Sequence, residues 1–66
     1  MTDREWWDTL PTGVEFVTPG GLRCRPGVPT GDDPPAPSPD HVFVEFWGAG
    51  GGWVRLAELR QWKRHA

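Results

Sequence analysis

The sequence predicts one small, mostly β domain: a barrel of about four to five strands with a short helical turn at each end. Two segments, 13–25 and 41–56, carry the strand pattern, because apolar residues alternate on both sides of a glycine-containing turn in each. After residue 56 the apolar residues recur every three positions, which is typical of a helical turn. The chain of 66 residues has room for only one small core, so 1–66 is expected to be a single domain.

The hairpin at 41–56 follows from pairing Trp47 with Trp53 across the five small residues 48–52. This register pairs three further positions: Phe46 with Val54, Val44 with Leu56, and Glu45 with Arg55. The first two pairs form an apolar core face, and the third is an opposite-charge pair on an outer face that also carries both tryptophans. A slip of one residue would exchange the two faces.

The segment 13–25 predicts a shorter hairpin around Pro19-Gly20-Gly21, where proline presets φ and glycine allows positive φ. Arg23 and Arg25 fall on its outer face. Its second strand, 22–25, is expected at a sheet edge, where unpaired backbone groups invite strand addition. Alternation assigns four residues to the inner face: Val14, Phe16, Leu22 and Cys24.

The N-terminal segment 1–12 contains Thr2 and Glu5 at the spacing of a capping box, which predicts a short helix. A helix of this length is stable only when it packs on the rest of the domain. Trp6 and Trp7 are therefore expected either to cover the core as a lid or to form an exposed interaction arm.

Residues 26–40 contain six of the eight prolines and three aspartates. Proline removes ladder donors and favours extended backbone, so an acidic loop is expected between the two hairpins. This loop is either a flexible connector or a proline-rich ligand for another domain. A helical or 3₁₀ turn after the second hairpin is expected to complete the unit 41–62, and residues 63–66 to form a basic tail.

The stretch 42–59 resembles the central hairpin of Tudor-type modules, which commonly read as alternating β residues, a glycine turn, a Val-rich strand and a Glu-Leu helical turn. The resemblance implies a small SH3-like barrel. In Tudor-type modules, aromatic side chains near the strand ends can form a cage for methylated Lys or Arg. Here only Trp47, Trp53 and Phe43 occupy comparable sheet positions, and the turn 19–21, expected near the cage mouth, carries no aromatic residue.

No catalytic or metal-binding set is apparent in the sequence. The single cysteine, Cys24, excludes an internal disulfide and is expected to be a small buried hydrophobe rather than a nucleophile. His41 and His65 lack zinc-site spacing, a local nucleophile and a spaced carboxylate. The run 48–52 lacks the Lys-Ser/Thr of a phosphate-binding loop. We therefore expect no cofactor, no metal and no enzymatic activity.

The formal net charge of −2 creates no strong field toward nucleic acid or an anionic membrane. No apolar run approaches the roughly 20 residues that span a bilayer, and the N-terminus lacks a signal-peptide pattern. A cytoplasmic protein is expected. The chain has no Ile, Asn or Tyr and a single Lys, which is typical of a GC-rich genome. We expect an actinobacterium or one of its phages as the source, and a phage protein would act in the host cytoplasm.

The outer face of the second hairpin is the best candidate for a binding surface. Exposed Trp beside Arg is the composition of interface hot spots, so a module that binds a partner protein or peptide is expected, such as a host factor for a phage protein. A cross-strand Trp pair is also stabilising in itself, which leaves a purely structural role open. The face is expected to carry five residues: Phe43, Glu45, Trp47, Trp53 and Arg55.

Two other functions stay open. A homodimer through the Trp face or the Trp6-Trp7 arm would cover apolar surface that a small core leaves exposed. A nucleic-acid-binding module would stack bases on aromatic residues, although the acidic segment 32–45 argues against it. It would use six basic residues: Arg23, Arg25, Arg55, Arg60, Lys63 and Arg64.

Overall fold

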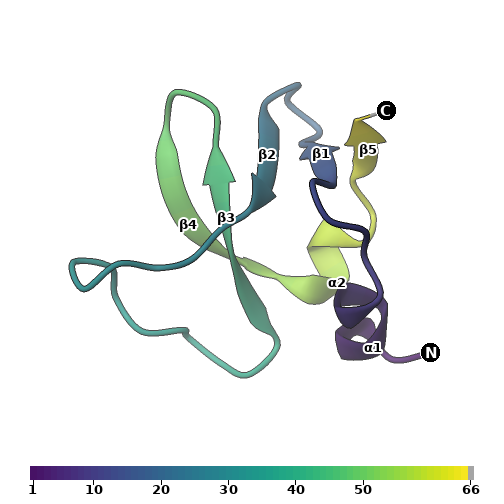
Figure 1. Ribbon diagram of the computed structural model, residues 1–66, viewed down its shortest axis with the longest axis horizontal. Coiled ribbons are helices and arrows are strands. Elements are labelled where there is room, and N and C mark those ends of the chain that lie inside the picture. Colours follow the sequence, from purple (N-terminus) through teal and green to yellow (C-terminus); the bar gives the residue numbers. More distant parts are fainter. Residues whose placement is uncertain (66) are drawn as a thin grey trace.

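The computed structural model describes residues 1–65, and it confirms the mostly β class. Five antiparallel strands form one sheet in the order β4-β3-β2-β1-β5 (Figure 1). The sheet curves like an open barrel, and β4 and β5 are its two edges. The elements in chain order are α1 (Asp3–Asp8), β1 (Glu15–Val17), β2 (Arg23–Pro26), β3 (His41–Phe46), β4 (Gly50–Arg55), α2 (Leu56–Leu59) and β5 (Lys63–His65). Neither helix in residues 1–65 is long and apolar enough to cross a membrane.

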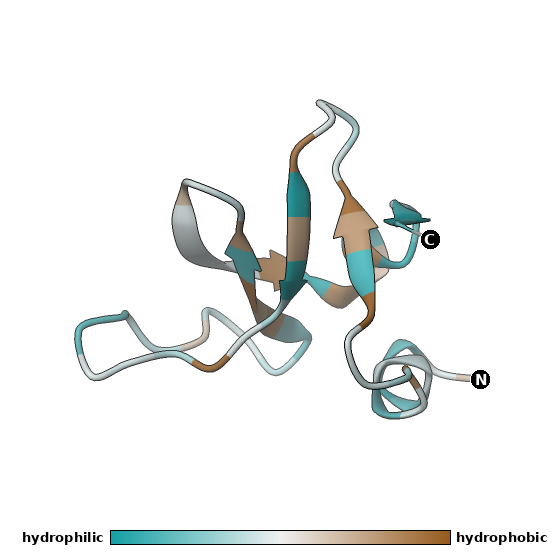
Figure 2. Ribbon diagram, turned by 45° about the horizontal axis from the view of Figure 1, so that its top comes forward, coloured by the Kyte–Doolittle hydropathy of each residue, from teal (hydrophilic) through white to brown (hydrophobic). Residues whose placement is uncertain are grey.

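The core lies between the inner face of the sheet and the two helices. Alternation along the strands supplies most of it, and Figure 2 shows brown and teal residues alternating along β2. Cys24 is fully buried, as predicted, and burial raises the pKa of its thiol. Seven residues form the buried cluster: Val14, Phe16, Cys24, Val42, Val44, Leu56 and Leu59.

The hairpin β3–β4 forms, but the predicted register is wrong. Phe43, not Trp47, lies opposite Trp53, and Phe46 lies opposite Gly50. The turn is shorter than predicted because Gly48 and Gly50 adopt positive φ angles of 73° and 76°, and β4 already begins at Gly50. The predicted pairing is displaced by four positions, an even number, so each side chain keeps its predicted face and changes only its partner.

The order of the strands corrects two further predictions. β2 lies between β1 and β3, so the segment 22–25 is not a sheet edge. Residues 63–65, predicted as a basic tail, form β5 beside β1, with Arg64 opposite Phe16. Three polar residues carry no strand pattern, and the pairing arises because the chain returns from α2 along β1. Ala66, the end of the predicted tail, lies outside the described residues. Leu22, predicted to point inward, is 39% exposed because it lies in the turn before β2.

The helix α1 begins with the predicted capping box. The Thr2 hydroxyl accepts a hydrogen bond from the Glu5 backbone N–H at 3.1 Å, and the Thr2 N–H donates to the Glu5 carboxylate at 3.0 Å. Trp6 and Trp7 are half-buried against the core, and the Trp6 ring lies 5.9 Å from the ring of Phe16. In this structure the two tryptophans therefore cover the core as a lid.

Candidate binding surface

The structure divides the predicted outer face into two regions. Residues 27–40, which we call the strap, leave the sheet after β2 and return to the start of β3 (Figure 1). The strap contacts Trp53, while Trp47 lies outside this contact and is 55% exposed. We call the exposed region the Trp47 surface; it consists of Arg23, Arg25, Glu45 and Trp47.

Trp47 is held by β2 although its side chain is exposed. Its backbone N–H donates to the carbonyl oxygen of Arg23 at 3.0 Å, just beyond the end of β3. The Arg23 guanidinium lies over the Trp47 ring, 4.8 Å from its centroid. The same guanidinium donates two hydrogen bonds to one carboxylate oxygen of Glu15, at 2.6 and 3.1 Å. These bonds lower the pKa of Glu15, and they position Arg23 over the indole.

A shallow hollow of about 240 Å³ lies beside the Trp47 ring. Arg25 and Glu45 face each other across β2 and β3, and both Nε and Nη2 of Arg25 lie 3.3 Å from one Glu45 oxygen. An aromatic surface beside a closed ion pair suits an apolar side chain of a ligand, with hydrogen-bonding groups at the rim. The hollow is lined by Arg25, Glu45, Phe46, Trp47 and Gly48.

The predicted pair of Glu45 with Arg55 is wrong. Glu45 pairs with Arg25 on the neighbouring strand, because the corrected register places Gly51 opposite Glu45. Arg55 lies opposite His41 at the far end of the hairpin, where its Nε is 3.8 Å from the carboxylate of Asp40. Arg55 is therefore not part of the Trp47 surface.

Phe43 and Trp53, predicted as exposed binding residues, form a covered aromatic pair. Phe43 is only 7% exposed, and its ring meets the Trp53 ring edge-on with centroids 5.3 Å apart. Gly51 allows this packing, because an added Cβ there would collide with the Phe43 ring. The Trp53 indole N–H donates to the carbonyl oxygen of Pro34 in the strap at 2.8 Å. The alternation along β3 and β4 correctly predicted the face of the sheet on which Phe43 and Trp53 lie. It did not predict that the strap contacts Trp53 there.

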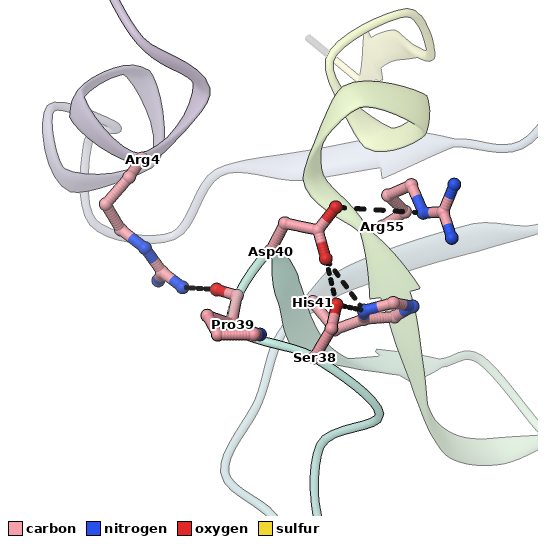
Figure 3. Close-up of polar contacts among 6 residues, drawn as sticks. All are labelled: Arg4, Ser38, Pro39, Asp40, His41 and Arg55. Atoms are coloured by element: carbon pink, nitrogen blue, oxygen red, sulfur yellow. Dashed lines mark hydrogen bonds and ion pairs between the residues drawn. The ribbon is translucent and has the colours of Figure 1, made fainter.

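A polar cluster that the sequence analysis missed lies where the strap joins β3 (Figure 3). The Ser38 hydroxyl donates to the Asp40 carboxylate, and these groups lie 2.7 and 3.2 Å from the same ring nitrogen of His41, Nδ1. The Ser38 hydrogen bond, followed by the charges of His41 and Arg55, lowers the pKa of Asp40. The short spacing Ser-Pro-Asp-His is the signal that could have revealed this cluster.

The sequence predicted neither a local nucleophile nor a spaced carboxylate partner for His41. The structure places the Ser38 hydroxyl and the Asp40 carboxylate beside its ring, but without the geometry of a serine nucleophile. In a Ser-His-Asp relay the hydroxyl and the carboxylate contact opposite nitrogens of the imidazole. Here both oxygens converge on Nδ1, and the backbone N–H of His41 donates to the carbonyl oxygen of Ser38 at 3.2 Å. This arrangement fixes the turn into β3, while Arg4 of α1 donates to the Pro39 carbonyl at 2.6 Å (Figure 3).

The basic residues predicted for nucleic-acid binding are largely neutralised by carboxylates. Within residues 1–65, four of the six form ion pairs. A paired arginine offers less charge to a phosphate backbone. No group of three or more metal-ligating side chains gathers in the same described residues. The four pairs are Arg23 with Glu15, Arg25 with Glu45, Arg55 with Asp40, and Arg60 with Asp3.

Comparisons of the chain with protein-family models, with curated proteins and with solved structures give no match. The function is therefore inferred from the geometry of the surface itself.

Proposed function

We propose that this chain is a non-enzymatic interaction module that binds a peptide segment of a partner protein through the Trp47 surface. The observation that carries this proposal is the side chain of Trp47, which is 55% exposed although the Arg23 guanidinium lies over its indole and its backbone N–H is bonded to β2. A large side chain that is already ordered loses little conformational entropy when a partner covers it. If the chain is encoded by a phage, the partner is a protein of the host cytoplasm.

The chemistry of the surface favours a peptide with an apolar anchor. A tryptophan can bury about 150–250 Å² against a partner, and such residues often contribute about 2 kcal/mol or more to binding. The exposed ring of Trp47 at the edge of the hollow offers an apolar contact to a side chain of the ligand. The Arg25–Glu45 pair at its rim offers both donors and acceptors to a peptide backbone.

The test is selection from a random peptide library, followed by affinity measurements on wild type, Trp47→Ala and Val28→Ala. Val28 is the matched control, because it is an exposed apolar residue in the strap. We expect Trp47→Ala to weaken binding at least about 30-fold and Val28→Ala to leave it unchanged. Equal affinity of wild type and a folded Trp47→Ala variant would contradict the proposal.

Nucleic-acid binding remains the alternative function, and the ion pairs of the arginines argue against it. Titration of the tryptophan fluorescence with single- and double-stranded DNA at low and moderate salt separates the two. Salt-sensitive quenching would favour nucleic acid, because binding to phosphates weakens as salt rises. Our proposal predicts no such quenching.

Self-association through the Trp47 surface is a further proposal, because a second copy can cover the exposed indole as well as a partner can. The two other supports for a dimer are weaker than the sequence suggested, since β2 is not an edge strand and Trp6 and Trp7 pack on the core. Sedimentation over a hundredfold concentration range decides the matter. If wild type sediments as a dimer and Trp47→Ala as a monomer, a second copy of the chain, rather than a ligand, covers the Trp47 surface.

A further inference from the structure

We propose that the face formed by Phe43 and Trp53 is a second binding site, for proline-rich peptide segments, and that the chain's own strap occupies it in this structure. The site is separate from Trp47 and does not rest on the function proposed for the Trp47 surface. The strap segment Pro34-Pro35-Ala36-Pro37 supplies the ligand chemistry in cis.

The contact with Trp53 carries the proposal. The indole Nε1 of Trp53 donates to the Pro34 carbonyl at 2.8 Å, and the ring of Phe43 packs edge-on against the indole. Proline-rich segments suit such a face for two physical reasons. They keep their carbonyl acceptors free of internal hydrogen bonds, and their backbone is already extended, so little entropy is lost on docking.

The strap is bonded to the rest of the chain at both ends, but its middle part beside Trp53 is exposed. At its start the Gly27 N–H donates to the Phe43 carbonyl at 3.1 Å, and at its end Arg4 holds the Pro39 carbonyl. Between these points the residues 34–37 are all exposed. A segment that is tethered yet exposed can be displaced by a similar segment without unfolding the sheet.

Space for a ligand exists beside the strap. A hollow of about 260 Å³ separates the outgoing limb of the strap from β3 and β4. Its floor includes the ring of Phe43 and the backbone of Gly51, which together extend the aromatic face toward the turn of the hairpin. A proline-rich peptide from another protein therefore meets both an aromatic floor and the indole donor once the strap moves.

The test compares wild type with a full-length variant carrying Pro34→Ser, Pro35→Ser and Pro37→Ser, which keeps the loop length but loosens the strap. The probe is a synthetic peptide with the sequence of residues 30–39. We expect the variant to bind this peptide about tenfold more tightly than wild type, because the internal competitor is weakened. A peptide with serine at the same three positions is the matched control and should bind neither protein.

Two further substitutions, each made in the variant with the three serines in the strap, locate the peptide-binding site. Trp53→Phe removes the indole donor and should weaken peptide binding about three- to tenfold, the effect of one neutral hydrogen bond. Leu22→Ala, at an exposed residue outside both surfaces, should leave binding unchanged. If the folded variant binds both peptides equally, or neither, the proposal is wrong.

If the serine strap prevents folding, the wild-type chain still provides the test. The indole resonance of Trp53 should move when the proline-rich peptide is added at millimolar concentration, while that of Trp47 stays fixed. A Trp53 resonance that does not respond would overturn the proposal.

Discussion

Trp47 and Trp53 flank the same short hairpin on the same face of the sheet, yet they lie in opposite environments. Trp47 is exposed and is stacked by Arg23 from the neighbouring strand. Trp53 is half-buried between Phe43 and the strap. The face of a strand residue follows from local alternation, but its exposure depends on what a distant segment covers. The Trp47 ring is thus open to solvent, whereas the Trp53 indole is bonded to the strap.

The largest expected difference between the two regions concerns stability. Phe43→Ala removes a ring that is 7% exposed and should lower the free energy of unfolding by about 3 kcal/mol or more. Trp47→Ala removes an exposed ring and should cost less than about 1 kcal/mol. Urea unfolding followed by circular dichroism measures both. Similar losses for the two variants would show that the environments do not differ as described.

The packing of Phe43 over Gly51 sharpens the comparison. Gly51→Ala introduces a methyl group into the Phe43 ring and should destabilise the chain by about 1–3 kcal/mol. Gly31→Ala, in the strap, is the matched control, because no atom lies within 4 Å of the added Cβ. A Gly51→Ala variant as stable as Gly31→Ala would exclude this position of the Phe43 ring.

The indole donor of Trp53 should have a smaller effect. Trp53→Phe keeps an aromatic ring against Phe43 but removes the hydrogen bond to Pro34, so the free energy of unfolding should fall by about 0.5–1.5 kcal/mol. Trp47→Phe should change it by less. Thermal unfolding of both variants under one buffer condition provides the measurement. If the Trp53→Phe variant were as stable as wild type, the hydrogen bond between Trp53 and the strap would contribute nothing to the free energy of unfolding.

The smallest expected effect is the pH dependence of the Glu15–Arg23 pair, whose guanidinium lies over the Trp47 ring. The hydrogen bonds from Arg23 lower the pKa of Glu15, so this pair stabilises the fold above the ordinary carboxyl pKa of 4.5 and loses that contribution as pH falls through the lowered value. Acidification below 4.5 should then release Arg23 and change the environment of the Trp47 indole. An NMR titration of that indole measures the change.

Glu15→Gln is the control for this titration. Asp40 and Glu5 also have lowered pKa values and titrate in the same acidic range, so a change that survives in Glu15→Gln comes from one of them. A Trp47 resonance that titrates identically in wild type and Glu15→Gln would contradict the coupling through Arg23.

The sequence predicted the mostly β fold, the capping box at Thr2, the buried Cys24 and the face of each residue in the second hairpin, because these depend on local periodicity. It failed on the register, because positive φ at Gly48 and Gly50 shortens a turn that composition alone shows only as glycine-rich. It also failed on β5, since polar residues 63–65 become a strand only through pairing with β1.

The candidate surface was predicted only in part, for a related reason. Trp47 and Glu45 lie where alternation placed them, but their partners Arg23 and Arg25 come from β2. The covering of Trp53 by a loop residue 19 positions earlier has no periodic signal at all. Contacts between segments distant in the chain depend on the fold as a whole, so local pattern cannot supply them.

The most direct test of the different roles of Trp47 and Trp53 is the accessibility of their indoles to a soluble paramagnetic agent. Resonances of ¹⁵N-labelled indoles, assigned with Trp47→Phe and Trp53→Phe, report each ring separately in the intact chain. We predict strong broadening of the Trp47 resonance and weak broadening of the Trp53 resonance, whose N–H is bonded to Pro34. Equal broadening of both, or a protected Trp47, would contradict the account.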